Sequence, residues 1–238
     1  MPHSRLHYSL LLTLSLSLVA ILDVAQNTGD YSGCNLSLAN GAALRGQISN
    51  TTGNMLADQG FRYELIYLSQ FFGVQPAFYI WNDGGSPNAK ATPQVLNPAH
   101  PDGTVLFGYS LMMSELRFTG QQTNFSIPAI MAHEFMHIVQ FKRGISLPTK
   151  LAELQADYMA GWFMGNRETF SVWSAQSFLG GAQTFFNKGD YAFNNAGHHG
   201  TPQERAGAIV AGFNKANVGF EQALEDSQTY LLSSVRDK

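Results

Sequence analysis

The stretch that decides the fold and the site runs His133-Glu134-Phe135-Met136-His137, inside an apolar segment of helical periodicity. Histidines four residues apart share one face of an α-helix with their Cβ atoms about 6 Å apart, so both imidazoles can bind one ion. Glu134 lies about 100° further around the helix, where its carboxylate can reach a water on that ion. The spacing therefore predicts a metal-binding helix with a carboxylate beside the metal.

The flanking residues predict that this helix covers residues 127–143. Apolar side chains recur there with the period of a helix. Ser126 precedes Pro128 at the start, and Gly144 follows the end. The alternative interpretation of the motif is a pair of structural histidines satisfied by neighbouring polar groups.

A second helix, predicted over residues 148–164, supplies a third ligand. A catalytic zinc takes three protein ligands and keeps one open position. Glu153 and Asp157 stand four residues apart on the polar face of this helix. We therefore assign Glu153 to the metal. Asp157 would accept the outer N–H of a ligand histidine, with His133 as the first choice. Without the upstream motif, the two carboxylates would be interpreted as a solvated helix face.

Composition limits the classes of protein that fit. The 238 residues are 45% hydrophobic, which suits one domain with a substantial core. The net charge of −3 and the 13% of charged residues argue against a nucleic-acid partner. Cys34 is the only cysteine, so an intrachain disulfide and a cysteine-based zinc site are both excluded.

The N-terminus predicts a targeting segment. An apolar run over residues 10–22 is too short for a full membrane span and fits the core of a signal peptide. We assign residues 1–25 to a signal peptide or an uncleaved anchor, 26–54 to a linker or lead-in, and 55–238 to one catalytic domain. The protein is then extracytoplasmic, secreted or periplasmic, or associated with a membrane through its N-terminal segment.

The order of the predicted elements indicates an α+β fold, with a short sheet first and a mostly helical part after it. Helices are predicted at 55–72, 110–118, 127–143, 148–164, 169–187, 202–214 and 218–232, and strands at 77–81, 88–92 and 104–108. Thr201-Pro202-Gln203-Glu204 predicts a capping box with proline in the first turn. The short polar stretch 88–92 suits a sheet edge, where charge and shortness protect an open hydrogen-bonding row. An extended peptide could pair with the main chain of residues 86–92 or of a neighbouring strand.

Three stretches of the chain together resemble the bacterial neutral zinc metallopeptidases. They combine a zinc helix, an acidic helix and a later His-Gly segment, here His133-Glu134-Phe135-Met136-His137-Ile138-Val139-Gln140, Glu153-Leu154-Gln155-Ala156-Asp157-Tyr158-Met159-Ala160-Gly161, and His199-Gly200-Thr201-Pro202-Gln203-Glu204-Arg205 with Gly212-Phe213. Stretches 87–91 and 103–108 are similar to strands before the zinc helix in HtpX-like and prenyl-protein-processing peptidases. The resemblance covers residues 55–214.

This resemblance implies a small gluzincin-type catalytic domain behind an N-terminal membrane or signal segment. It implies that His133, His137 and Glu153 bind the zinc and that Glu134 is the general base.

The resemblance also implies an active-site position for a late histidine. In the HtpX-like group a histidine stands six residues before an arginine, as His199 and Arg205 do here. His198 is the alternative residue for this role, and a structural histidine that caps a helix or binds a carbonyl is the alternative role. Arg205 could pair with Asp157 or with another buried carboxylate.

These observations predict a zinc-dependent endopeptidase with one Zn²⁺ per chain and a peptide or protein substrate. Glu134 would deprotonate a zinc-bound water that attacks the peptide carbonyl, and His199 or His198 would stabilise the oxyanion. The first alternative is a non-catalytic extracytoplasmic module in which the zinc is structural or lost. The second is a zinc hydrolase that acts on a non-peptide amide.

Overall fold

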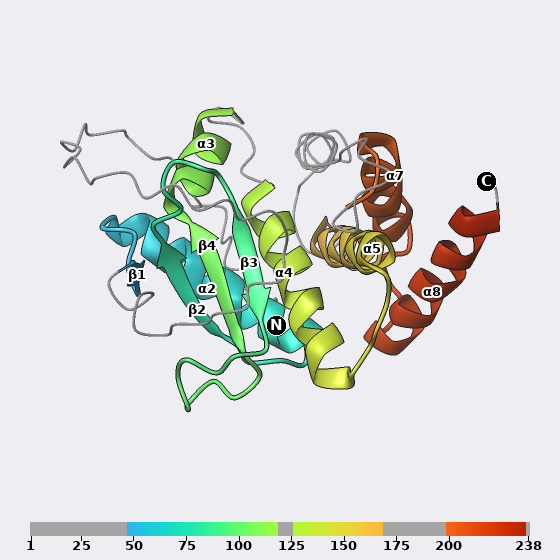
Figure 1. Ribbon diagram of the computed structural model, residues 1–238, viewed down its shortest axis with the longest axis horizontal. Helices are drawn as coiled ribbons and strands as arrows, with labels where there is room; N and C mark the ends of the chain where they lie inside the picture. Colours follow the sequence, from blue (N-terminus) through green and yellow to red (C-terminus); the bar gives the residue numbers. More distant parts are fainter. Residues whose placement is uncertain (1–46, 119–125, 169–198, 237–238) are drawn as a thin grey trace, which may run out of the picture.

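The computed structural model describes residues 47–118, 126–168 and 199–236 (Figure 1). Within these ranges the chain forms a small mixed sheet of four strands together with six helices, and most of the described residues are helical. The sheet and α2 come first in the chain, and the helices that follow stack beside them. The predicted α+β fold is therefore confirmed.

The sheet has a mixed topology that the pattern of apolar residues did not reveal. Its strands are β1 (Ile48–Ser49), β2 (Ala77–Trp81), β3 (Ala89–Thr92) and β4 (Thr104–Gly108). Their order is β1-β2-β4-β3, with β2 and β4 parallel and both outer pairs antiparallel. β1 lies within the segment that we interpreted as a linker or lead-in, so the end of that segment belongs to the sheet.

β3 lies at the predicted sheet edge, but its side chains do not face solvent. All four of its residues are buried, and α4 packs along the strand. Lys90 is only 1% exposed, and its Nζ lies 5.3 Å from the centre of the Trp81 ring. The charge of Lys90 therefore does not protect this edge as expected, because the lysine lies inside the protein against an aromatic ring.

Helix α2 (Met55–Phe72) covers the sheet and has the predicted boundaries. The side chain of Asn54 caps its N-terminus by accepting the N–H groups of Leu56 and Ala57. Gly73 ends it in the left-handed conformation, with φ of 66°, which glycine adopts without strain. The ring of Phe61 packs against Phe78 of β2, so the helix is fixed on the sheet.

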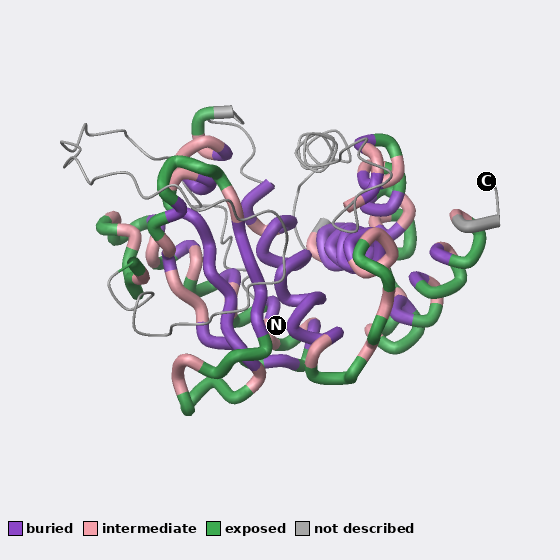
Figure 2. The backbone as a smooth tube through the Cα atoms, viewed as in Figure 1, coloured by how far each residue is buried: buried purple, intermediate pink, exposed green. Residues whose placement is uncertain are grey.

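Two buried helices form the centre of the molecule. Helix α4 (Ser126–Arg143) and helix α5 (Thr149–Glu168) match the two predicted site helices, and both are mostly buried (Figure 2). Residues 153–166 of α5 are buried without interruption. The expected polar face of α5 is thus not solvated, because α4, α7 and α8 all pack against this helix.

The remaining described helices enclose α5 or follow the sheet. They are α3 (Tyr109–Phe118), α7 (Pro202–Phe213) and α8 (Phe220–Arg236). The predicted capping box of α7 is present, since the Thr201 side chain accepts the N–H of Glu204 while the Glu204 carboxylate accepts the N–H of Thr201. This cap sets the direction in which α7 returns along α5.

The contact between α5 and α7 depends on small residues. A Cβ atom added at Gly161 would lie 1.9 Å from the carbonyl oxygen of Ile209, and one added at Gly212 would lie 1.8 Å from that of Tyr158. Side chains at these positions would therefore force the helices apart. The close approach brings the first turns of α7 to the polar residues of α5.

Some expectations fall on residues that the structure does not describe. The N-terminal segment 1–25, the predicted helix 169–187 and His198 all lie outside the described ranges. Within those ranges, no helix has the length and apolar composition that a bilayer crossing requires.

Candidate metal centre

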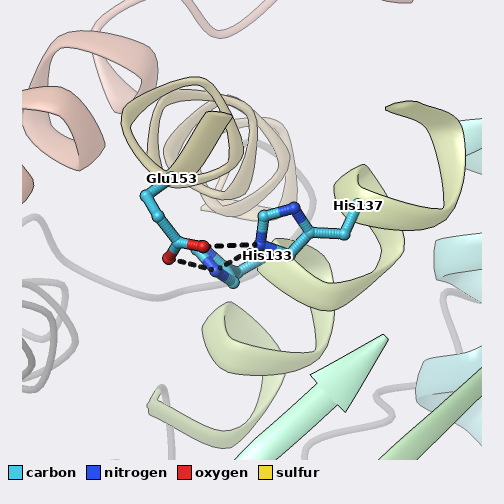
Figure 3. Close-up of side chains that lie close together, drawn as sticks. All are labelled: His133, His137 and Glu153. Atoms are coloured by element: carbon cyan, nitrogen blue, oxygen red, sulfur yellow. Dashed lines mark hydrogen bonds and ion pairs between the residues drawn. The ribbon is translucent and has the colours of Figure 1, made fainter. Parts of the chain in front are cut away.

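The three predicted ligands come together between α4 and α5 (Figure 3). Nε2 of His133 and Nε2 of His137 are 3.0 Å apart. The Glu153 carboxylate approaches them from the facing helix, at 3.4 Å from the nitrogen of His133 and 3.3 Å from that of His137. The structure thus unites two histidines of one helix with a glutamate that follows the second histidine by 16 positions into one buried group.

These separations fit the donor atoms of a tetrahedral ion. With bonds of 2.0–2.1 Å, as zinc makes to nitrogen and carboxylate oxygen, neighbouring ligands stand about 3.3 Å apart. The same side chains also contact one another as ion pairs, so distance alone does not separate a metal site from a buried polar network. The orientation of the two rings provides a second test.

A carboxylate lies on the outer side of His133. Its Nδ1 lies 2.8 Å from Oδ1 of Asp157. A carboxylate this close favours the ring form of His133 that carries its proton on Nδ1, because a carboxylate oxygen accepts and does not donate. The other ring nitrogen, Nε2, then faces the group of ligands and presents a lone pair to it when the ring is neutral.

Asp157 is held in turn by Arg205 from α7. The guanidinium Nε and Nη2 donate to Oδ2 and Oδ1 of Asp157 at 2.6 and 2.7 Å, and Nη1 lies 3.3 Å from Oε2 of Glu153. The predicted pairing of Arg205 is therefore present. It links the predicted metal ligand and the predicted partner of His133 through one bidentate cation.

His137 is oriented by a residue to which the sequence analysis assigned no role. Its Nδ1 lies 2.8 Å from Oε1 of Gln140, one turn further along α4. The amide nitrogen of Gln140 donates to the carbonyl of Ala152 and to Oε1 of Gln155, so its oxygen is the atom that faces the ring. The spacing of three residues between His137 and Gln140 on one helix was the signal available in the sequence.

The two ring orientations make four acceptor atoms converge. Both histidines donate through Nδ1, so their Nε2 lone pairs face each other across 3.0 Å, with both oxygens of Glu153 beside them. Lone pairs at this distance repel unless a proton or a metal ion lies among them. The donor set therefore fits a metal cation, and two imidazoles with one carboxylate are the ligands of many catalytic zinc sites.

The charges of the site lead to the same conclusion. Glu134, Glu153 and Asp157 are buried and interact with one buried guanidinium, that of Arg205. Three buried acidic side chains therefore share one guanidinium. A divalent cation among them would offset this excess of acidic groups, whose charge is costly to bury uncompensated.

A proton is the competing occupant. Burial lowers the pKa of His133, but the hydrogen bonds and charges of Asp157 and Glu153 outweigh burial and raise it to about 10. Burial raises the pKa of Glu153, but the nearby His137, His133 and Arg205 hold it well below its usual value. A metal ion that binds these residues must therefore displace a tightly held proton from His133.

Glu134 is buried beside the ligands without being one of them in this arrangement. It is 3% exposed, and its Oε2 has no hydrogen-bond partner among the described residues. Burial raises its pKa, with smaller opposing effects from the charges of His133 and His137. A buried carboxylate oxygen without a partner is costly, so its retention beside a metal site suits a group that binds a water or a substrate.

His199 lies at the edge of the same region. It is half-buried and directly precedes Gly200, where an added Cβ would lie 3.4 Å from the side chain of Leu154 on α5. The segment is therefore packed beside the turn of α5 that holds Glu153. An oxyanion-stabilising role for His199 remains a prediction.

Comparison of the chain with models of known protein families, with curated proteins and with solved structures finds no match. The site is therefore interpreted from its own geometry.

Proposed function

We propose that the protein is a zinc-dependent hydrolase of peptide bonds, built around His133, His137 and Glu153. The observation that supports this most directly is the convergence of two imidazole lone pairs and a carboxylate, with the unligated Glu134 carboxylate next to them. A zinc ion held there would activate a water and polarise the scissile carbonyl.

The chain's own residues would then perform the proton transfers. Glu134 accepts a proton from the attacking water and returns it to the leaving amine. Glu134 follows His133 directly on α4, so its carboxylate lies beside the ligands but points in a different direction from the helix axis. His199 is the proposed partner of the oxyanion that develops during attack.

Two features support a peptide substrate: the packing of the site helix against the sheet, and the edge strand of that sheet. The site helix α4 packs along β3, which is one of the two outer strands of the sheet. An extended peptide that adds to β3 by main-chain pairing would run beside the metal ligands. The two-helix ligand pattern and this edge together agree with a gluzincin-type enzyme.

A second candidate function is a structural metal site in a non-catalytic module. The observation that favours it is burial, since each of the three ligands exposes only 2–4% of its surface. A peptide must reach the open position of a catalytic metal, whereas a structural site needs no access. Glu134 favours catalysis, because a structural site has no use for a base.

The first experiment compares the wild-type protein with Glu134→Gln, which keeps the shape and removes the base. Both proteins should hold one zinc per chain by elemental analysis. Digestion of a broad peptide library by the variant should fall by on the order of 100-fold or more. Equal zinc content with no cleavage by either protein would favour the structural site, or an amide substrate outside the library. Equal cleavage by both would remove Glu134 from the mechanism.

A further inference from the structure

A chain of polar side chains runs from the outer side of His137 to the C-terminal helix. Gln140 accepts from His137 and donates to Gln155 on α5, at 2.8 and 3.0 Å. Gln155 donates to the hydroxyl of Ser227 on α8 at 3.2 Å, and Ser227 donates to the carbonyl of Leu224 at 2.6 Å. Gln140 is 4% exposed, while Gln155 and Ser227 are completely buried.

The direction of every hydrogen bond in this chain is determined by backbone carbonyls. The carbonyls of Ala152 and Leu224 can only accept, so they face the amide nitrogen of Gln140 and the hydroxyl proton of Ser227. The Ser227 oxygen must then accept from Gln155, whose own oxygen must accept from Gln140. No donor or acceptor along the path can be reversed without placing two acceptors together.

The fixed direction of these hydrogen bonds determines which ring nitrogen of His137 carries the proton. A reversed Gln140 amide would present N–H groups to Nδ1, and the ring would then carry its proton on Nε2, where it could not bind a metal. The observed direction instead forces Nδ1 to donate and leaves the Nε2 lone pair among the ligands. The path thus selects the metal-binding form of the ring through contacts on three helices.

We propose that Gln140, Gln155 and Ser227 form a positioning relay that holds His137 in its Nδ1–H form and couples the C-terminal helix α8 to the metal centre. The role of the relay in metal binding rests on the proposed function. The hydrogen bonds that form it do not depend on catalysis. It is the counterpart for His137 of the Asp157–Arg205 pair behind His133. None of the relay residues is a catalytic residue, because each acts through His137.

The decisive experiment uses Gln140→Met, which retains the volume and removes the amide. We expect the zinc dissociation constant, from competition with a chelator, to rise about 10–100-fold. Nitrogen-15 spectra of the metal-free protein, recorded at a pH where the His137 ring is neutral, should show that His137 of the wild type is the Nδ1–H form. The variant should show a mixture of both forms. A wild-type ring protonated on Nε2, or an unchanged ring and zinc affinity in Gln140→Met, would overturn the proposal.

A matched pair on α8 tests the far end of the relay. Ser227 and Ser234 both donate to the carbonyl three residues earlier, but only Ser227 also accepts from Gln155. Ser227→Ala should weaken zinc binding by about 5-fold, the equivalent of one net hydrogen bond. Ser234→Ala should leave zinc binding unchanged. Equal effects of the two substitutions would show that α8 is not coupled to His137.

These measurements separate the relay from the proposed function. If the wild type binds no zinc, the proposed function fails, and the form of the His137 ring still decides whether the relay exists. If the wild type binds zinc and cleaves nothing, the affinities of the variants still test the relay. Should Gln140→Met fail to fold, Gln155→Met and Ser227→Ala give the same two readouts.

Discussion

Asp157 shows how one side chain determines the chemistry of another. It lies 2.8 Å from Nδ1 of His133 and receives two hydrogen bonds from Arg205, and it is completely buried. Its negative charge favours the ring form that presents Nε2 to the ligands. Arg205 pairs with the same carboxylate, so its negative charge is not buried without a partner.

We therefore expect Asp157→Asn to lower the affinity for zinc by about 10–100-fold. The variant keeps the size of the side chain, but its amide has one acceptor instead of two for His133 and Arg205. The measurement is a zinc titration of the wild type and the variant, together with their unfolding midpoints without metal.

Asp226→Asn is the control for that titration. Asp226 also pairs with a cation, Lys215 at 3.3 Å, but it lies away from the ligands on α8. Its substitution should leave zinc affinity unchanged. Wild-type zinc affinity in Asp157→Asn would remove Asp157 from the site and weaken the assignment of Glu153.

At the scale of elements, the site depends on how closely α7 approaches α5. Arg205 is in the second turn of α7, and it reaches Asp157 only because Gly161 and Gly212 let the two backbones touch. The ligands themselves come from α4 and α5, which are joined by a short connection. Their outer partners, Asp157 and Gln140, lie on the same two helices. Helix α7 holds Asp157 directly, and α8 holds Gln140 through a further side chain of α5.

Gly212→Ala should therefore destabilise the fold by about 1–3 kcal/mol, the usual cost of overpacking a core. The added methyl group would meet the carbonyl of Tyr158 at 1.8 Å, and a backbone atom cannot move aside alone. Unfolding in urea measures the effect. Zinc affinity should fall as well, because Arg205 is displaced from Asp157.

Gly207 is the matched control on the same helix. A Cβ added there would meet only the hydroxyl of Tyr230 at 3.4 Å, which is ordinary contact. Gly207→Ala should stabilise the protein by up to about 1 kcal/mol, because alanine is the better helix former. Similar stability changes in the two variants would contradict the role given to the close approach.

At the scale of the whole molecule, a bound metal would tie the helical part together. The three ligands lie on α4 and α5, while Arg205 connects them to α7 and Gln155 connects the group to α8. An ion that binds only the folded chain stabilises all of these helices at once. Without it, the buried negative charges oppose folding unless protons neutralise them.

Zinc at 100 times its dissociation constant should stabilise the fold by about 2.7 kcal/mol. For a domain of this size we expect the melting temperature to rise by about 5–10 °C. Thermal unfolding with zinc, and again after a chelator, measures the change. Magnesium should have little effect, because it prefers oxygen ligands in octahedral geometry. An unchanged melting temperature after zinc addition would argue against a site of useful affinity.

Much of the local structure follows from the sequence alone. The bounds of β2, β4 and α2 match the predicted ranges, and the cap of α7 has the predicted form. These features depend on interactions between residues a few positions apart, such as a threonine hydroxyl and a glutamate in one turn. The spacing of His133 and His137, and of Glu153 and Asp157, also follows directly from helix geometry.

Only the tertiary structure decided the features that join distant segments. The insertion of β4 between β2 and β3, the pairing of β1 and the burial of α5 on all sides depend on packing between elements. Nothing in the sequence distinguishes Gln155 from other polar residues. Its hydrogen bond to Ser227 forms only because α8 packs against α5. The periodicity of a sequence indicates which face of a helix is apolar. A buried polar contact depends instead on which other helix packs against the polar face.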